Sequence, residues 1–380
     1  MSSRPGRAVR RALTAIVPVT ALLALAACGT DATPAADTAK AAASDSPGLT
    51  AARNALRTYS KRPDKIPVTQ PVGKKIPTGK KIDFVLCGVQ SCQDLADFFT
   101  AAADQLGWRV NQIPTQGTPE SVQAAYETAV RDKPDAVISS GFPRAVYAKQ
   151  LAQLKAAGIP VIQSNADDVV GDGIELLKNG PKEVGVQGEM LASWAVADSG
   201  AQANTVYFDL PAYTILKPVK DSFAAKYKEL CPSCALDAVD VPITSIGKDI
   251  PDRVVSYVRS HPKVDHIVFS LGLLNVGVPS ALKTAGITGK HIAVNVGDAQ
   301  NYQYIQSGLS DAAVALNSHE SMWLQADALA RRFTGQSMDV DQKAVLPLTL
   351  ITKDNLSMAV GDFPLVKNYQ AQFQALWGLN

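Results

Sequence analysis

Residues 135–165 read DAVISSGFPRAVYAKQLAQLKAAGIPVIQSN, and this stretch decides the fold. It begins and ends with short apolar runs, at 136–139 and 160–163, which are typical of buried strands. The residues between these runs favour a helix. A strand, a helix and a second strand within about 30 residues form the unit that connects two parallel strands by a right-handed crossover. The stretch therefore predicts a parallel sheet covered by helices.

The same alternation continues on both sides of this stretch. Upstream, apolar runs at 82–87 and 108–113 are separated by a helical pattern with Leu95, Phe98 and Phe99 on one face. The first four predicted strands begin about 26 residues apart, which is the step that a crossover needs. Downstream, residues 167–203 hold one more short strand and a long helix. The alternation then resumes with predicted strands at 205–208, 236–241, 266–270, 292–296 and 313–316.

Length and composition narrow the class of protein. The chain has 380 residues, more than one hydrophobic core usually supports, so the two groups of strands predict two lobes. Because the strands are almost continuously apolar, each sheet is expected to be covered on both faces, which is an α/β fold with two doubly wound parallel-sheet lobes. A content of 46% hydrophobic residues excludes a disordered chain, and a net charge of +2 argues against a nucleic-acid partner.

The first residues have the features of an export signal. Residues 1–11 carry four arginines and no acid, and residues 12–27 form an apolar run too short to remain as a membrane span. The sequence around Cys28, LAACG, resembles a bacterial lipobox, in which the cysteine receives a lipid such as palmitate. Residues 1–27 are therefore expected to be a lipoprotein signal peptide and Cys28 a lipid anchor to the cell membrane. A plain secretory signal with an unused cysteine is the alternative.

Residues 28–78 are expected to form a spacer and a linker. Residues 29–48 are rich in Ala, Thr, Ser, Pro and Asp and have no large apolar side chain to bury. Residues 49–62 have the pattern of a short amphipathic helix. Residues 63–81 are rich in Pro and Lys, which predicts an extended and solvated segment. Attraction of its lysines to anionic lipids is a second interpretation.

Five cysteines are present, and the four beyond Cys28 form two close pairs, Cys87/Cys92 and Cys231/Cys234. In an oxidising compartment such pairs indicate local disulfides that stiffen a turn. A redox-active CxxC and a zinc site of four cysteines are the alternatives. The second pair follows a helical pattern instead of opening one, so no helix N-terminus helps to lower a thiol pKa. The two pairs also lie about 140 residues apart, which disfavours a shared metal, and no metal site is expected.

The sequence contains no catalytic constellation. Residues 87–92 have one glycine where a dinucleotide fingerprint needs three, and neither GxxxxGK[ST] nor GxSxG occurs. The histidines are scattered, and each is interpreted as a surface or core residue: His261, His266, His291 and His319. We therefore expect neither an enzyme nor a cofactor.

Three segments resemble the type I periplasmic binding proteins, especially their sugar-binding cluster. Residues 135–165 are similar to a signature of that family, in which an Asp-led strand and a helix are followed by Ala-Gly-Ile-Pro-Val, here residues 157–161. Residues 293–298, AVNVGD, are similar to the family's Gly-Phe-Asp strand end. Residues 313–327 resemble the segment that recrosses between the lobes. The likeness extends over residues 82–350, and the Cys87–Cys92 turn resembles actinobacterial lipoprotein members.

The resemblance implies two lobes joined by a three-strand hinge. One lobe is expected to comprise residues 79–168 and 317–342, and the other residues 169–316 and 343–380. Ligands of open α/β sheets bind beyond the carboxyl ends of the strands, so two such ends would enclose a cleft that closes by hinge motion. The resemblance further implies a monomer whose closed form is recognised by the permease subunits of an ABC transporter in the membrane.

The expected ligand contacts lie just past strand ends: Gln90, Ser91, Phe142, Asn165, Tyr213, Asn275, Asp298 and Asn317. Asp298 stands where sugar-binding relatives place a carboxylate, and Phe142 or Tyr213 is expected to offer a stacking face. A role of Phe142 in helix packing and of Asn275 as an N-cap are the alternatives. Ala166 follows Asn165 where relatives often have Arg, and the first strand end lacks their aromatic pair. Both departures weaken a sugar as the ligand more than they weaken a small polar ligand.

The function that the resemblance implies is an extracytoplasmic substrate-binding lipoprotein of an ABC importer, with a sugar as the expected ligand. The alternatives are a carrier of an aromatic or less polar metabolite, a sensor subunit, and a disulfide oxidoreductase that uses Cys231 and Cys234. A cytoplasmic repressor shares the fold, but the leader and the lack of a DNA-binding headpiece argue against it. Trp194 and Trp323 are expected to report closure of the lobes.

Overall fold

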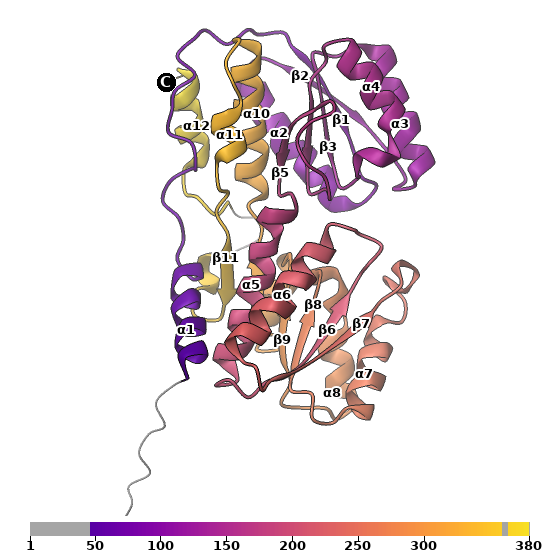
Figure 1. Ribbon diagram of the computed structural model, residues 1–380, viewed down its shortest axis with the longest axis vertical. Helices are drawn as coiled ribbons and strands as arrows, with labels where there is room; N and C mark the ends of the chain where they lie inside the picture. The colour runs from indigo at the N-terminus through magenta and orange to yellow at the C-terminus, as the bar shows by residue number, and fades with distance from the viewer. Residues whose placement is uncertain (1–45, 359–363, 380) are drawn as a thin grey trace, which may run out of the picture. The chain divides into compact units, whose positions relative to one another are not determined.

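Two sheets in two lobes organise the described residues, which are 46–358 and 364–379 of a computed structural model (Figure 1). The expected signal peptide and Cys28 lie outside these residues. Among the helices of the described residues, none combines the length and the apolar composition that crossing a bilayer requires.

The first lobe contains a five-stranded sheet with the order β2-β1-β3-β4-β5, in which every pair is parallel. Its strands are β1 (Lys81–Val85), β2 (Arg109–Ile113), β3 (Ala136–Ser140), β4 (Val161–Ser164) and β5 (Ile174–Lys178). The crossover helices are α2 (Gln90–Gln105), α3 (Pro119–Asp132) and α4 (Ala148–Ala156).

Alternate residues of these strands enter two different hydrophobic layers. Ile138 packs in the layer that contains α2, whereas its neighbour Val137 packs in the layer that contains α3 and α4. Ile162 and Val161 of β4 divide in the same way. Successive side chains of a strand point to opposite faces, so both faces of this sheet are covered, as its apolar strands predict.

The second lobe contains a six-stranded sheet with the order β11-β10-β9-β8-β6-β7. Its strands are β6 (Asn204–Asp209), β7 (Ala235–Asp240), β8 (His266–Phe269), β9 (His291–Val294), β10 (Ala312–Ala315) and β11 (Thr349–Thr352). Its helices are α5 (Pro181–Asp198), α6 (Leu216–Leu230), α7 (Ile250–Ser260), α8 (Val278–Thr284) and α9 (Ala299–Gln306). Only β11 is antiparallel to its neighbour in this sheet of described residues. The doubly wound α/β fold predicted from the sequence is confirmed, and β11 is the strand that the prediction lacks.

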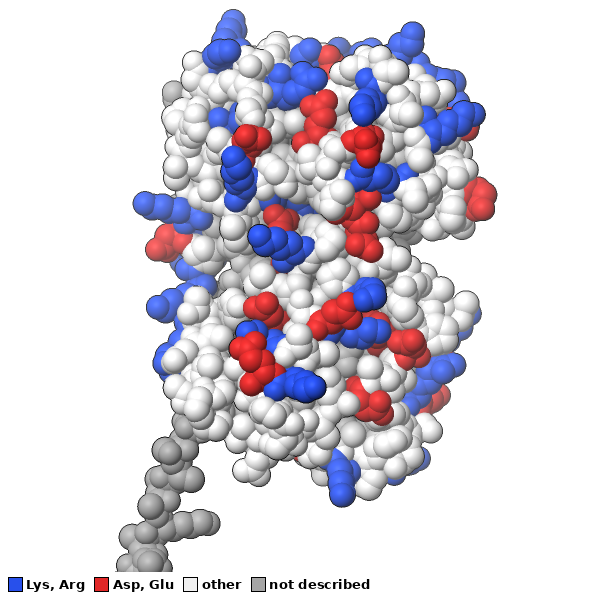
Figure 2. Space-filling model, viewed as in Figure 1, with Lys and Arg blue, Asp and Glu red and all other residues white. Residues whose placement is uncertain are grey.

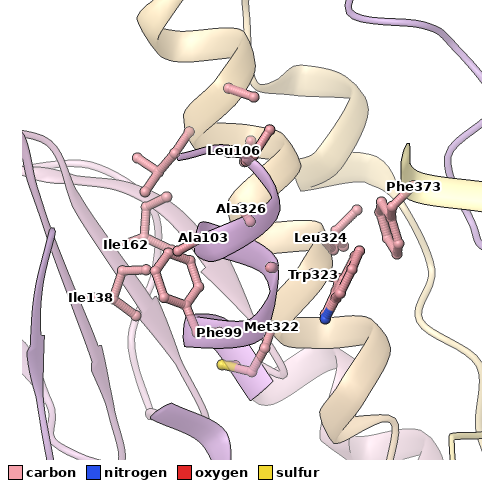
Figure 3. Packing of buried hydrophobic residues seen from close by; sticks show 14 of the residues in the cluster. Phe99, Ala103, Leu106, Ile138, Ile162, Met322, Trp323, Leu324, Ala326 and Phe373 are labelled. Carbon is pink, nitrogen blue, oxygen red and sulfur yellow. The ribbon is translucent and has the colours of Figure 1, made fainter. Parts of the chain in front are cut away.

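Two assignments to the lobes differ from the expected ones. β5 belongs to the first sheet, although residues from 169 onward were expected in the second lobe. α12 (Tyr369–Trp377) packs on α10 (Ser318–Phe333) in the first lobe (Figure 3). There the rings of Trp323 and Trp377 stack with centroids 5.3 Å apart. The apolar face of α12 needs cover, and α10 supplies it, so the chain returns to the first lobe after β11.

Residues 60–80, here called the strap, are not a solvated linker as predicted. Its apolar side chains are buried in the core of the first lobe: Ile66, Val68, Val72 and Ile76. Gln336 donates a 2.6 Å hydrogen bond to the carbonyl of Val72, and Arg331 donates one to the carbonyl of Gln70. The preceding helix α1 (Pro47–Tyr59) packs in the second lobe, with Ala52 buried in its core. The strap therefore connects the two lobes and belongs to the folded structure.

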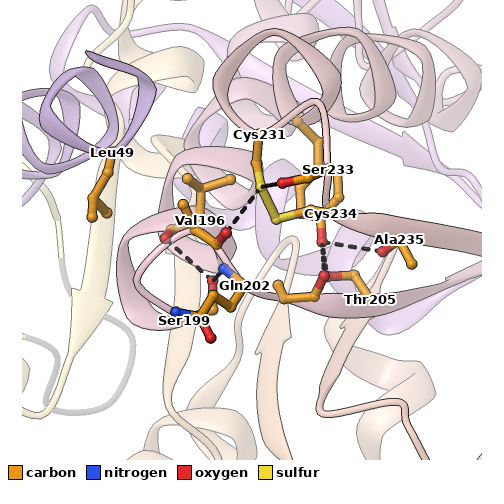
Figure 4. Close-up of a disulfide and its surroundings, with 12 residues drawn as sticks. Leu49, Val196, Ser199, Gln202, Thr205, Cys231, Ser233, Cys234 and Ala235 are labelled. Carbon is orange, nitrogen blue, oxygen red and sulfur yellow. Dashed lines mark hydrogen bonds between the residues drawn. A yellow bond between two sulfur atoms is a disulfide. The ribbon is translucent and has the colours of Figure 1, made fainter. Parts of the chain in front are cut away.

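Both predicted disulfides are present. Cys87–Cys92 closes the turn between β1 and α2, and Cys231–Cys234 closes the turn between α6 and β7 (Figure 4). Cys231 is buried in the core of the second lobe, and its sulfur lies 3.3 Å from the carbonyl oxygen of Ala201. A reactive thiol pair is partly exposed in an electropositive surrounding, so this burial favours a structural bridge.

Candidate functional site

The carboxyl ends of both parallel sheets lie at one junction between the lobes. β5 ends at Lys178, and the chain passes directly into α5 of the second lobe. Because the first sheet is wholly parallel, the carboxyl ends of all its strands share that side. β10 ends at Ala315 and leads directly into α10 of the first lobe, and β6 to β9 are parallel to it. The two carboxyl edges, here called the rims, therefore face the same junction, which is where open α/β sheets bind ligands.

Asn317 joins three crossings of the chain at this junction. Its Oδ1 accepts a hydrogen bond from Nδ2 of Asn179, with 3.3 Å between the two atoms, and its Nδ2 donates to the carbonyl of Pro347 at 3.0 Å. Both asparagines are buried. Asn179 follows β5, Asn317 follows β10, and Pro347 precedes β11. Asn317 was predicted as a ligand contact, but both polar ends of its side chain are engaged by the hinge.

Lys178 is a second residue that holds the crossings together, and the sequence analysis missed it. Its side chain is wholly buried at the end of β5. Its Nζ lies 2.5 Å from Oε1 of Glu183 in α5 and donates to the carbonyl of Ala344 at 2.7 Å. A lysine directly after the apolar pair Leu176 and Leu177 is the signal that was available, because a buried ammonium group needs partners.

On the first rim, Asn165 remains half-exposed directly after β4. Its Nδ2 donates a 3.0 Å hydrogen bond to Oγ of Ser140, the last residue of β3. Its backbone is left-handed, with φ 51°, a conformation that asparagine tolerates better than most residues. The strands β3 and β4 therefore present an amide to the junction in a fixed orientation.

Phe142 and Arg144 shape the loop beside Asn165. Phe142 is half-buried against the core below β3, and its carbonyl accepts a hydrogen bond from Gln163. Arg144 donates from Nε to Oδ1 of Asp168 at 2.9 Å and from its backbone nitrogen to Oδ2 at 2.6 Å. The packing role of Phe142 is thus present, and the residue remains partly exposed. Arg144, which holds the loop after β4, is not among the predicted site residues.

Gln90 and Ser91 are exposed in the first turn of α2, beyond the carboxyl end of β1. Nε2 of Gln90 donates to Oδ1 of Asp94 at 3.0 Å within the helix. The loop before them is close to its neighbour: a Cβ on Gly88 would lie 2.6 Å from the backbone nitrogen of Gly117. Since Gly88 also has φ +86°, this position requires glycine.

On the second rim, Asp298 is the exposed N-cap of α9. Its Oδ1 accepts hydrogen bonds from the backbone nitrogen of Asn301 at 2.9 Å and from its Nδ2 at 2.7 Å. Its Oδ2 has no hydrogen-bond partner among the described residues. One oxygen therefore fixes the carboxylate, and the other stays available to a hydroxyl donor.

Asn275 was predicted as a ligand contact, but it is wholly buried beneath this helix. Its Nδ2 donates to Oδ1 of Asn301 at 3.1 Å and to Oγ of Ser310 at 3.0 Å. Asn275 therefore positions Asn301, which in turn holds Asp298. Its place in the structure is a supporting one, behind the rim.

Asn295 and Val296 follow β9 directly, and the sequence analysis did not select them. Asn295 is wholly buried, and neither its Nδ2 nor its Oδ1 has a hydrogen-bond partner among the described residues. Val296 has a left-handed backbone with φ 52°, which is strained for a β-branched residue. Unpaired buried amides and backbone strain both concentrate at functional sites, where a ligand or water completes the bonding.

Tyr213 is half-buried after β6 and packs against the core of the second lobe. Burial raises the pKa of its hydroxyl group above the ordinary value. The hydroxyl therefore stays protonated at physiological pH and can donate a hydrogen bond. Of the eight predicted contacts, six follow strand ends on one rim or the other: Gln90, Ser91, Phe142, Asn165, Tyr213 and Asp298. Asn275 and Asn317 lie in supporting positions.

Two further hollows lie on the surface, and the second of them reaches Asp240 at the carboxyl end of β7. A hollow of 750 Å³ is lined by the strap, the end of α2 and α12, and one of 560 Å³ lies beside β7 and α7. Lysine, arginine and acidic side chains are interspersed on the face that Figure 2 shows. Trp194 and Trp323 are buried in the cores of their lobes, so they are poorly placed to report closure, contrary to the expectation above.

A family model described as a periplasmic binding protein domain matches residues 90–337, which is well over half of the chain. The matched family is one of binding proteins and not of enzymes. Among curated proteins, none matches the sequence significantly.

Solved structures with the same fold include several ABC transporter proteins. An ABC sugar transporter subunit from Rhodobacter sphaeroides has a TM-score of 0.64 and 20% identity, over 73% of this chain and 99% of that one. A solute-binding protein from Agrobacterium vitis with bound allitol has the same TM-score and identity, over 74% and 97%. A periplasmic ribose ABC transporter structure from Conexibacter woesei has a TM-score of 0.64 and 15% identity, over 75% and 95%. At these identities, the similarity establishes the fold.

Proposed function

The chain belongs to the periplasmic binding protein family, and from that premise we propose that it is the substrate-binding lipoprotein of an ABC importer. It captures a small polar ligand, a sugar, between its two lobes. The observation that carries this proposal is the meeting of both carboxyl rims at one junction, since that geometry lets two lobes contact one solute.

The chemistry of the rims suits a hydroxylated ligand. Asn165 on the first rim and Asp298 on the second offer an amide and a carboxylate, and Gln90 and Ser91 add exposed polar groups. A carboxylate that accepts a hydroxyl hydrogen bond contributes more than a neutral acceptor does. Tyr213 supplies a phenol that can donate, together with a ring face for stacking.

Capture proceeds by hinge closure. A ligand that contacts both rims binds the closed arrangement more tightly than the open one, and this difference in affinity is what shifts the population. The crossings joined by Asn317 are the segments that adjust in this motion, and hinges are commonly a few residues at the ends of elements. The closed protein then delivers the ligand to the permease subunits.

The protein works outside the cytoplasm, tethered through a lipid on Cys28 after removal of residues 1–27. The two local disulfides support this location, because such bonds persist in oxidising compartments. Mass spectrometry of the membrane fraction tests the anchor: an acylated N-terminal Cys28 is expected, and an unmodified Cys28 in a longer chain contradicts it.

A carrier of an aromatic or less polar metabolite is the second candidate. Ala166 follows Asn165, and no arginine stands there to hold hydroxyls or a carboxylate. Phe142 on the first rim and Tyr213 on the second are partly exposed aromatic residues, and they favour this alternative at the same junction.

Isothermal titration against a panel of sugars, polyols and aromatic acids separates the two candidates. Asp298→Asn should weaken a hydroxylated ligand by about 1.5–3 kcal/mol, the range for a hydrogen bond to a charged group. The matched control is Asp354→Asn, because Asp354 is exposed beyond Thr352, which pairs with the opposite end of β10. Heat only with aromatic acids, or equal affinities in the two variants, overturns the sugar assignment.

A further inference from the structure

Three residues that are far apart in the sequence meet at the edge of the second sheet opposite its rim. His266 begins β8, His291 begins β9, and the two are direct register partners in the parallel ladder. Because paired residues project from the same face, their rings stack, with centroids 5.0 Å apart and planes 13° from parallel. Asp198, the last residue of α5, reaches both rings.

The ligand atoms of the three side chains converge. Oδ2 of Asp198 lies 3.1 Å from Nε2 of His266 and 2.9 Å from Nδ1 of His291. One ligand atom from each residue lies within 4.8 Å of the other two. With zinc–ligand bonds of about 2.0–2.2 Å and tetrahedral angles, neighbouring ligand atoms stand about 3.3 Å apart. Small rotations of the side chains therefore make room for an ion.

Nδ1 of His291 has no hydrogen-bond partner in the part of the chain that the structure describes. The atom is buried, and although it lies 2.9 Å from the Asp198 carboxylate, it has no partner in hydrogen-bond geometry. An ion coordinated by this ring nitrogen and by the carboxylate oxygen beside it would satisfy both atoms.

The surrounding side chains have the roles of outer-shell partners. Nδ1 of His266 lies 2.6 Å from Oδ1 of Asp265, which leaves Nε2 facing Asp198. Metal-bound histidines usually have such a carboxylate on the other ring nitrogen. Oδ1 of Asp311 lies 3.8 Å from Nδ1 of His291, within reach of the fourth position. Among the ion pairs of described residues, the carboxylates of Asp198, Asp265 and Asp311 pair only with the two histidines. A divalent cation would therefore offset their negative charge.

We propose that Asp198, His266 and His291 bind a divalent transition-metal ion, zinc. Two imidazole nitrogens and a carboxylate oxygen suit zinc, whereas calcium and magnesium prefer oxygen ligands only. The His291 side chain is 44% exposed and that of Asp198 30%, so the ion enters from solvent, and buried His266 closes the inner side. The ion would fasten the end of α5 to the sheet, and this role is independent of the proposed ligand at the rims.

Zinc titration of the chelator-treated chain by calorimetry tests the proposal. We expect one ion per chain, a raised melting temperature with zinc, and no response to calcium. His291→Ala and Asp198→Asn, both at partly exposed side chains, should abolish the binding, and Asp265→Asn should weaken it by about 10–100-fold, as is typical of outer-shell partners. His261→Ala is the matched control, since His261 is exposed in the same lobe and stacks on Tyr257.

Trp194 offers a second readout, because its ring lies 5.5 Å from that of His266. Copper or nickel bound at the site should quench Trp194 fluorescence, and Trp194→Phe should remove the quenching while calorimetric binding persists. Absence of zinc binding, or equal binding in His291→Ala, Asp198→Asn and His261→Ala, overturns the proposal.

Discussion

Asn179 and Asn317 form a buried hydrogen bond between two crossings of the chain, with 3.3 Å between Nδ2 and Oδ1. Asn179 directly follows β5, the last strand of the first sheet, and Asn317 follows β10 of the second sheet. The bond therefore connects two of the segments that cross between the lobes, and both segments belong to the proposed hinge.

Replacing Asn317 by Ala should destabilise the protein by about 1–3 kcal/mol, because Asn179 and the carbonyl of Pro347 lose their buried partner. Urea unfolding measures the change. Asn54→Ala, on an exposed face of α1, is the control and should have little effect. Equal unfolding midpoints for the two variants would contradict the role of Asn317 in the hinge.

Lys178→Met should cost about 3 kcal/mol, the lower end for breaking a buried ion pair, since Glu183 is partly exposed and water screens it. The substitution also leaves the carbonyl of Ala344 without its donor. Thermal unfolding of Lys178→Met beside Glu183→Gln checks this, with the larger loss expected for the lysine variant. A reversed order would show that the carbonyl contacts of Lys178 do not matter.

Strands were the part of the fold that the sequence predicted best. Apolar runs such as the one at 136–139 are buried on both faces whatever their neighbours are, so local pattern suffices to find them. The strap was misread because its alternating apolar residues stand among prolines and lysines, and only the surface of the first lobe gives them a place to pack. The same holds for α12, whose position depends on Trp323 in a helix far from it in sequence.

For the candidate site, the sequence predicted which residues follow strand ends, but not which of their side chains are buried. Asp298 and Asn165 follow strands and remain exposed or half-exposed, as expected. Asn275 and Asn317 are asparagines like Asn165 and also follow strands. Their side chains are nevertheless buried by tertiary partners that no local pattern reveals. Likewise, His266 and His291 appear scattered in the sequence until the register of β8 and β9 places them side by side.

The stability of the first lobe should fall as the pH rises. Burial and the neighbouring Asp327 carboxylate raise the pKa of Asp341, although Arg331 is close by. The folded protein thus binds a proton that the unfolded chain releases above about pH 4, the ordinary value for aspartate. This stabilisation is complete at low pH and is lost as the pH rises through the raised folded value, by at most about 1.4 kcal/mol per pH unit.

Denaturant unfolding between pH 5 and 9 provides the measurement for this prediction, with Asp341→Asn as the comparison. The variant should lose most of the downward slope, because its amide does not titrate. An identical slope in both proteins would mean that Asp341 does not hold the proton.

Val296→Asn should raise the stability by about 1 kcal/mol, because asparagine tolerates the left-handed conformation that strains valine. The position directly follows β9 and neighbours the unpaired Asn295, so the variant should also change ligand affinity. Unfolding and calorimetric titration together check both effects. A less stable variant would show that the valine side chain contributes more through packing than its backbone costs.

The distance between the lobes, measured with and without ligand, tests the central claim most directly. Spin labels at Lys149→Cys in α4 and Lys248→Cys before α7 lie on exposed residues that follow the carboxyl ends of β3 and β7. The native cysteines among the described residues are disulfide-bonded, so they do not react with the spin label. With a ligand found by calorimetry, the distance should shorten, and Asp298→Asn should shift this response to higher ligand concentration. Saturated binding with an unchanged distance would contradict capture between the lobes.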